Sequence, residues 1–314
     1  MEKKRNYLLL ILRGCAMGAA DVVPGVSGGT IAFITGIYEE LIDSIKSIDL
    51  QALKLLFSFR LADFWKKING SFLLSVVLGI AISIFSLAKL MTWLLENHPI
   101  HIWSFFFGLI IASTILVAKE IKKWNILTLL ALLAGACAAY AITVMTPAET
   151  PNTWWFIILS GAIAICAMIL PGISGAFILL LMGKYSYILG AVSNLNIGIL
   201  LLFIVGAVAG IISFSHLLSW LLKNYHTLTV SLLTGFMVGS LNKVWPWKET
   251  IQTYIDNHGV EKALIESNVS PHHFGELTQS NPLLWEAILM CIMGFLLIWG
   301  IETIGKKLQA KQDK

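Results

Sequence analysis

The sequence carries one glycine-rich motif twice, once in each half. The first copy, VPGVSGGTIAFITGIY, occupies residues 23–38, and the second, LPGISGAFILLLMGKY, occupies residues 170–185. An offset of 147 positions makes these pairs identical: Pro24/Pro171, Gly25/Gly172, Ser27/Ser174, Gly28/Gly175, Ile31/Ile178, Gly36/Gly183 and Tyr38/Tyr185. Both copies lie in strongly apolar sequence, where proline and glycine interrupt a helix. A broken segment repeated in both halves of a membrane protein is typical of a transporter with its substrate site between the halves.

The composition is that of an integral membrane protein. Hydrophobic residues make up 57% of the chain and charged residues 13%, with a mean hydropathy of +0.80. A soluble domain carries about 25% charged residues, and several apolar stretches here approach the roughly 20 residues that a spanning helix needs. Tyr7–Leu12 is too short for the apolar core of a signal peptide, so we expect no cleaved leader.

The repeat divides the chain into residues 1–147 and residues 148–314. In each part we expect a re-entrant helical hairpin and three transmembrane helices, which together make an all-α polytopic membrane protein. The hairpins cover residues 7–37 and 154–189, because the apolar pieces on either side of the first break are too short to span a membrane. The second hairpin is longer, and two shallow spans are an alternative there. The expected transmembrane helices cover approximately residues 71–95, 100–118, 125–145, 197–222, 227–243 and 283–304.

Three crossings in each half predict that the second half is inverted relative to the first. With the N-terminus in the cytoplasm, most of the 22 lysines and arginines fall in segments on the inner side, as the positive-inside rule predicts. We therefore expect both termini in the cytoplasm. Two full spans in place of either hairpin give the same parity, so the charges do not establish that the hairpins are re-entrant.

Two long connections are expected outside the membrane. Residues 39–70 are basic and mildly amphipathic, which favours a position on the inner leaflet surface. Residues 245–281 contain histidines and carboxylates on the outer side. Their spacing does not repeat, so it favours a solvated loop over a metal site.

The motif has the properties of an anion site. Pro24-Gly25 ends one half-helix, and the next begins near Ser27. The first turn of a helix leaves its N–H groups without partners, and here they belong to Ser27, Gly28, Gly29 and Thr30. These donors, with the positive end of the helix dipole, suit a phosphate or a carboxylate.

The second copy offers Ser174 and Gly175 in the same way after its own break at Pro171-Gly172. We expect the two tips to meet near the membrane midplane and to pass an anion from one to the other. The alternative is purely structural, in which the small residues let the tips touch and neighbouring carbonyls satisfy the N–H groups.

Two charged residues precede the first break. A charge near the bilayer centre costs about 2.5–3.5 kcal/mol on insertion scales, so it is usually functional or paired. We expect Arg13 to meet the phosphate and Asp21 to carry a coupling proton. Alternatively, they pair with each other or with lipid headgroups. Lys89 and Lys184 are expected to extend their ammonium groups towards the membrane surface.

The motif segments GCAMGAADVVPGVSGGTIAFITGIYEELI, CAMILPGISGAFILLLMGKY and LLTGFMVGSLNKVWPW resemble the bacterial polyprenyl-phosphate transporter family, and the similarity extends over essentially the whole chain. The resemblance implies movement of undecaprenyl phosphate from the outer to the inner leaflet of the cytoplasmic membrane, which returns a lipid carrier for peptidoglycan and other envelope polymers. The second copy has Ala176-Phe177 in place of Gly29-Thr30, so its tip is expected to be less polar.

Two other functions are open at this point. Undecaprenyl-pyrophosphate phosphatases have a similar PGxSRSG pattern, but Gly28 and Gly175 stand at the arginine position, which removes the electrophilic clamp that such chemistry needs. A permease for a small soluble anion fits the same donors. We expect no catalytic, metal or cofactor site. The expected partners are the lipid phosphate and membrane lipids, with no nucleic acid, and a homo-oligomer is left open.

Overall fold

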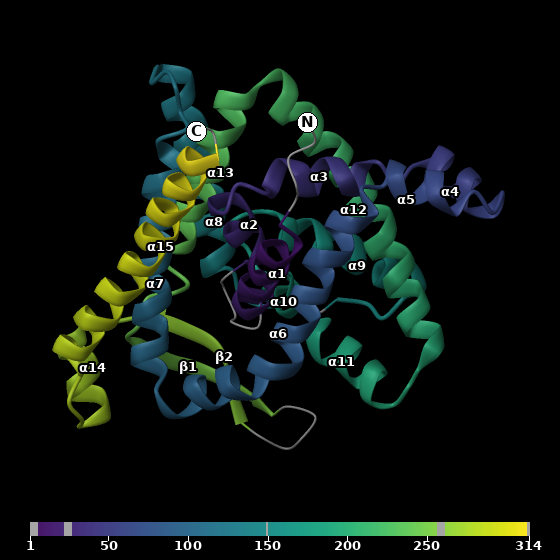
Figure 1. The fold of residues 1–314 in the computed structure, drawn as a ribbon. Helices are drawn as coiled ribbons and strands as arrows, with labels where there is room; N and C mark the ends of the chain where they lie inside the picture. Colours follow the sequence, from purple (N-terminus) through teal and green to yellow (C-terminus); the bar gives the residue numbers. More distant parts are fainter. Residues whose placement is uncertain (1–5, 22–26, 149, 256–260, 313–314) are drawn as a thin grey trace.

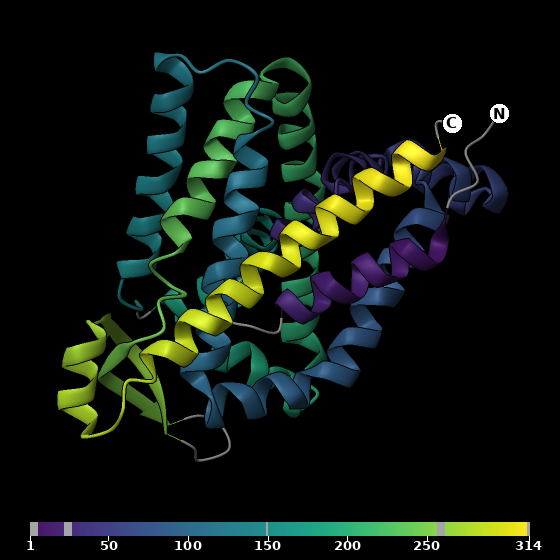
Figure 2. The same cartoon turned by 60° about the vertical axis from the view of Figure 1, so that its left-hand side comes forward.

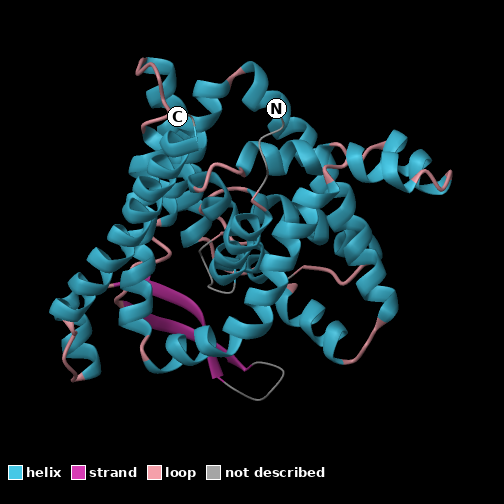
Figure 3. Ribbon diagram, viewed as in Figure 1, coloured by secondary structure: helices cyan, strands magenta, loops and turns pink. Residues whose placement is uncertain are grey.

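The computed structural model describes residues 6–21, 27–148, 150–255 and 261–312, and these residues are mostly helical (Figures 1 and 3). The helices of the first half are α1 (Tyr7–Asp21), α2 (Gly28–Ile34), α3 (Tyr38–Lys46), α4 (Leu50–Phe57), α5 (Leu61–Lys67), α6 (Gly70–Asn97), α7 (Pro99–Ala118) and α8 (Ile126–Val144). The elements of the second half are α9 (Trp154–Ile169), α10 (Gly175–Leu181), α11 (Tyr185–Ser193), α12 (Ile197–Asn224), α13 (His226–Ser240), β1 (Lys248–Ile255), β2 (Glu261–Asn268), α14 (Pro271–Thr278) and α15 (Leu284–Gln312).

The order and length of the helices repeat along the chain. The offset of 147 that aligns the two motifs also relates both ends of α2 to those of α10, and both ends of α3 to those of α11. Gly36 and Gly183 follow the paired half-helices and have φ values of 71° and 60°, a conformation that glycine adopts at little cost. The chain therefore turns at the same point in each half before α3 or α11 begins. That the halves are inverted in the membrane stays a prediction.

In the part of the chain that the structure describes, four helices are long and apolar enough to cross a membrane: α6, α7, α8 and α12. A fifth crossing is counted if α10 and α11, which are bent by 113°, form one broken span. The prediction of a polytopic helical membrane protein is confirmed. Two of the six expected spans are shorter in the structure, because α13 has only 15 residues and the apolar part of α15 within the described residues is Leu284–Gly300.

Long helices pack in pairs at glycines. α1 lies along α6 and α9 along α12, whereas α7 packs on α15 and α8 on α13, so the last two helix pairs join the halves (Figure 2). A Cβ atom placed on Gly108 comes within 1.9 Å of the Cys291 carbonyl, and one on Gly235 within 2.0 Å of the Leu132 carbonyl. Small residues let transmembrane helices approach this closely.

Both long connections have regular structure. Residues 39–70 form α3, α4 and α5, and α4 and α5 extend sideways from the helical body in Figure 1. Residues 245–281, expected to be a solvated loop, contain the antiparallel pair β1–β2 and then α14. In Figure 2, α1 begins and α15 ends at the end of the molecule away from this sheet. The two long connections therefore lie at different ends of the protein.

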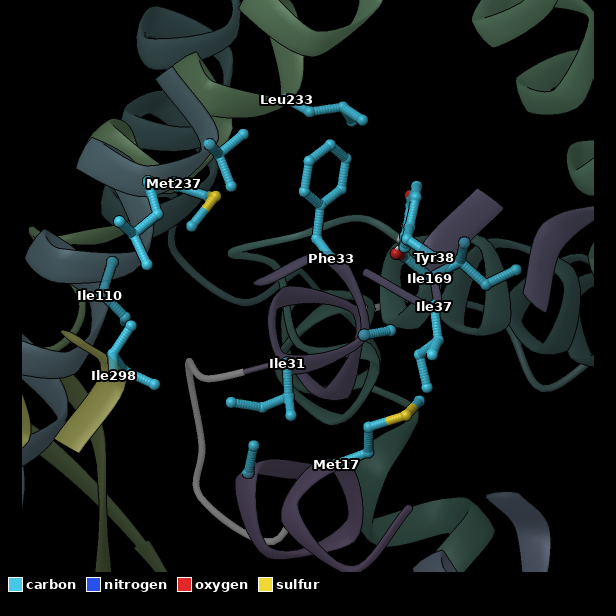
Figure 4. Close-up of a cluster of buried hydrophobic side chains, with 14 of the residues drawn as sticks. Met17, Ile31, Phe33, Ile37, Tyr38, Ile110, Ile169, Leu233, Met237 and Ile298 are labelled. Atoms are coloured by element: carbon cyan, nitrogen blue, oxygen red, sulfur yellow. Dashed lines mark hydrogen bonds between the residues drawn. The ribbon is translucent and has the colours of Figure 1, made fainter. Parts of the chain in front are cut away.

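The hydrophobic core surrounds the short helix α2. Ile31 and Phe33 of α2 are buried together with Met17 of α1, Ile169 of α9 and Met237 of α13 (Figure 4). Because the core is centred on α2, the first motif lies inside the protein and its polar groups must find partners there.

Candidate functional site

At the first break, side chains of the protein accept hydrogen bonds from the N–H groups that begin α2. Ser27 is the N-cap of α2, and its hydroxyl accepts the Gly29 N–H at 3.1 Å. The Asp21 carboxylate accepts the Gly28 N–H at 2.6 Å. An anion therefore already occupies the N-terminus of α2, and it is the carboxylate at the end of α1. Pro24 and Gly25, the predicted break, lie outside the described residues.

The second break differs from the first, because among the described residues no side chain caps the helix that follows it. Gly172 has a φ of 86°, and a Cβ atom there would come within 2.9 Å of Ser240 Oγ and 3.0 Å of the Phe236 carbonyl. Only glycine suits both the backbone conformation and the space. Ser174 stands at the N-cap of α10 with 7% of its surface exposed, but its side chain makes no capping hydrogen bond. Gly175 begins α10 and is buried.

The two breaks touch in the buried centre of the molecule. Thr30 Oγ1 accepts the Gly172 N–H at 3.0 Å, and Ser27 Oγ donates to the Met168 carbonyl at 2.9 Å. Ser27 and Thr30 are each 1% exposed. A Cβ atom on Gly29 would come within 2.3 Å of the Ile169 carbonyl. The residues of the first motif thus lie directly against the end of α9 and the turn that follows it.

The predicted charged residues separate into two places. Asp21 lies at the first break. Arg13, eight residues earlier on α1 and so about 12 Å away along the axis, interacts electrostatically with Glu40 of α3. Arg13 and Asp21 therefore do not form one cluster, and the carboxylate that acts electrostatically on Arg13 is that of Glu40, near the start of α3.

Two further residues have roles that the sequence interpretation missed. Tyr38 is 2% exposed, and its hydroxyl donates to the Ile169 carbonyl at 3.2 Å. Its identity with Tyr185 in the repeat was the signal that could have identified it. Lys184 is 1% exposed instead of extended towards the surface, because its ammonium donates to the Thr150 carbonyl and Asn152 Oδ1, each at 2.7 Å.

Comparison with known proteins identifies the family. A family model described as undecaprenyl phosphate translocase-like matches residues 17–262. A polyprenyl-phosphate transporter of Vibrio cholerae is 50% identical over 306 residues, which cover 97% of this chain and 99% of the relative. A polyprenyl-phosphate transporter of Staphylococcus aureus is 36% identical over 254 residues, covering 75% of this chain and 85% of the relative.

No solved structure matches the chain significantly. The matched relatives are named as transporters and not as enzymes, which argues against the phosphatase alternative. The family match, residues 17–262, includes both motif copies in full. This multi-pass membrane protein therefore belongs to the undecaprenyl phosphate translocase-like family.

Proposed function

We propose that this protein carries polyprenyl phosphate across the membrane, and that its substrate is undecaprenyl phosphate moving from the outer to the inner leaflet of a bacterial cytoplasmic membrane. The family and the names of both relatives support the substrate class. The phosphate needs a polar site inside the protein, whereas the long isoprenoid tail can stay in lipid between helices.

The meeting of the two breaks is the proposed phosphate site, formed by Ser27, Gly28, Gly29, Thr30, Ser174 and Gly175. The observation that carries this assignment is the pair of hydrogen bonds between the copies, from Gly172 N–H to Thr30 and from Ser27 to Met168. A small movement of one half exchanges these internal contacts for contacts to a ligand. Backbone N–H donors in a dry site bind an oxyanion strongly because water does not compete there.

Asp21 holds the place of the phosphate when the site is empty. Its carboxylate accepts the Gly28 N–H, so a phosphate oxygen and this carboxylate compete for one donor at the positive end of α2. Protonation of Asp21 weakens its hold on Gly28. Proton uptake at Asp21 thus frees the Gly28 N–H for a phosphate oxygen, which couples substrate binding to proton movement. Arg13 is proposed to attract the phosphate on its way to Gly28.

The direction is the one that the family resemblance implies. An inverted repeat with both termini in the cytoplasm then gives each tip its own side of the membrane. Each half supplies a broken element of equal length, since α2 and α10 both have seven residues. The start of α1 and the end of α15 lie away from the β-hairpin (Figure 2), which agrees with termini on one side and the hairpin outside. We propose the first tip as the inner-leaflet side of the site and the second tip as its outer-leaflet side.

The test is leaflet exchange in proteoliposomes that contain the purified full-length protein and fluorescent undecaprenyl phosphate, followed with a membrane-impermeant quencher. We expect Ser27→Ala combined with Ser174→Ala to slow exchange about tenfold or more, since a hydrogen bond to a charged group contributes about 1.5–3 kcal/mol. Ser113→Ala is the matched control, because Ser113 is fully buried and donates only to the Leu109 carbonyl of its own helix at 2.7 Å.

Three results would argue against the proposal. If the double variant exchanges undecaprenyl phosphate between leaflets as fast as wild type, the paired tips take no part in the mechanism. Release of inorganic phosphate from undecaprenyl pyrophosphate restores the enzyme alternative. Equally fast uptake of inorganic phosphate into the vesicles indicates a permease for small anions.

A further inference from the structure

A cavity of about 520 Å³ lies at the bend between α10 and α11. Three separate segments form its wall. Thr150 and Asn152 come from the connection between α8 and α9, Lys184 and Tyr187 from the bend, and Gln252 and Ile265 from the β-hairpin. The hairpin and α11 lie at the same end of the molecule (Figure 1). The cavity is therefore at the end of the protein away from the start of α1.

A buried cation is part of this cavity. The Lys184 ammonium donates to the Thr150 carbonyl and to Asn152 Oδ1, both at 2.7 Å. It also lies 5.3 Å from the ring centroid of Phe156 and 5.7 Å from that of Tyr187. These partners are neutral, so they orient the ammonium without cancelling its charge. An ammonium has three N–H donors, and these two hydrogen bonds use two of them.

Contacts that do not involve Lys184 also hold the wall. The Ala148 N–H donates to the Leu181 carbonyl at 2.8 Å, and the Thr150 hydroxyl donates to the Met182 carbonyl. Both contacts tie the α8–α9 connection to the end of α10. Burying a cation is unfavourable unless it is well compensated. The partners named for the Lys184 ammonium are all neutral, so its buried charge points to an anionic ligand.

The charge is present in only one half of the repeat. At the offset of 147, Ile37 matches Lys184, and Ile37 is 2% exposed in the hydrophobic core. Lys184 lies beyond the C-terminal end of α10, whereas Ser174 caps its beginning. Seven helical residues separate the cavity from the second tip by roughly 10 Å.

We propose that this cavity is an entry site that binds a phosphate monoester headgroup, with Lys184 as the cation that recognises it. The proposal rests on the proposed function, because the headgroup bound here is the one that then moves along α10 to the tips. Because only the second half of the repeat has a lysine at this position, the entrance of the transport path differs from its exit.

The experiment measures binding by calorimetry, using the full-length protein in nanodiscs of neutral phosphatidylcholine and farnesyl phosphate as the probe. Lys184→Met is expected to weaken binding about tenfold, the loss of one charge-assisted hydrogen bond. Lys184→Arg keeps the charge and is expected to retain most of the affinity. Lys248→Met is the matched control, because this buried lysine near the hairpin pairs with Glu266 and does not line the cavity.

A second variant covers the case in which Lys184→Met does not fold. Gln252 is an exposed strand residue, so Gln252→Trp fills the cavity from the hairpin without disturbing the helices. Unchanged farnesyl phosphate affinity in both variants overturns the proposal. Inorganic phosphate is the second probe: much weaker binding than farnesyl phosphate supports a lipid headgroup, and equal affinity overturns that assignment in favour of free phosphate.

Different measurements test the entry site and the paired tips, so one hypothesis can be refuted without the other. Binding that depends on Lys184 should persist in the Ser27→Ala/Ser174→Ala protein, even if that protein no longer exchanges lipid between leaflets. Conversely, if Lys184→Met binds normally while wild-type exchange is intact, the entry site is wrong and the transport function stands.

Discussion

Thr30 accepts the backbone N–H of Gly172 at 3.0 Å and so joins two motif copies across 142 residues of sequence. The repeat cannot form this contact in the opposite sense, because Phe177 stands at the position that matches Thr30 and has no polar atom in its side chain. The junction between the halves is therefore asymmetric, even though the helices around it have matching lengths. The Thr30 hydroxyl of the first copy is thus the hydrogen-bond acceptor for the Gly172 N–H in the turn of the second.

Thr30→Val should destabilise the protein by about 1–3 kcal/mol, because it preserves shape and leaves the buried Gly172 N–H without a partner. Thr30→Ser should retain most of the stability. Thr234→Val is the control, since Thr234 is also 1% exposed but donates only to the Val230 carbonyl of its own helix. Thermal unfolding in detergent measures the difference. Equal losses for the two valine variants would mean that the contact between halves contributes nothing.

Gly29→Ala should push the two helix breaks apart by a steric clash with the end of α9. Replacing glycine by alanine inside a helix normally stabilises it by about 1 kcal/mol, but here the new Cβ would come within 2.3 Å of the Ile169 carbonyl, a backbone atom. The expected sign is therefore reversed, with lower thermal stability and slower leaflet exchange. Gly300→Ala on α15 meets nothing within 4 Å and should be neutral or stabilising. A Gly29→Ala protein as stable and active as wild type would contradict the close contact.

Pro24 and Gly25 lie outside the described residues. The sequence nevertheless marked equivalent positions in the two halves, because the offset of 147 that relates the motifs also relates α2 to α10. It predicted Asp21 at the tip but not its bond to Gly28, because the intervening residues leave the direction of the carboxylate open. It missed β1, although Thr250, Ile251 and Thr253 are typical strand residues, because surrounding charges suggested a solvated loop. The length of α13 depends on where tertiary packing stops, and hydropathy does not encode that.

Asp21→Asn should distinguish the role of the Asp21 side chain as a hydrogen-bond acceptor for Gly28 from the role of its charge. The amide oxygen of asparagine can still accept the Gly28 N–H, so stability should change little, whereas Asp21→Ala should lose about 1 kcal/mol with the cap. In proteoliposomes, the asparagine variant should exchange undecaprenyl phosphate at a rate that no longer responds to an imposed pH gradient. A response as large as that of wild type would remove Asp21 from proton coupling and leave it as a helix cap.

The sheet formed by β1 and β2 should become more stable as the pH rises above 8. Lys248, at the start of β1, donates to the Lys243 carbonyl at 2.8 Å and lies 4.2 Å from the ring centroid of Trp103. Burial lowers the pKa of Lys248 from 10.5 to about 8, against the attraction of Glu266. Between these two values the unfolded chain binds more protons than the folded one, so the free energy of unfolding increases with pH in this window.

Comparison with Lys248→Met isolates this effect. From pH 7.5 to 9.5, wild type should gain about 1–2 kcal/mol relative to the variant, measured by pulse proteolysis of the hairpin in detergent. Below pH 7.5 the two should run parallel, because Lys248 is then largely protonated in both the folded and the unfolded state. Glu266→Gln removes the attraction that raises the pKa of Lys248, so the gain in stability should begin at lower pH. Parallel curves for wild type and Lys248→Met across the whole range would show that the buried ammonium does not control the stability of the sheet.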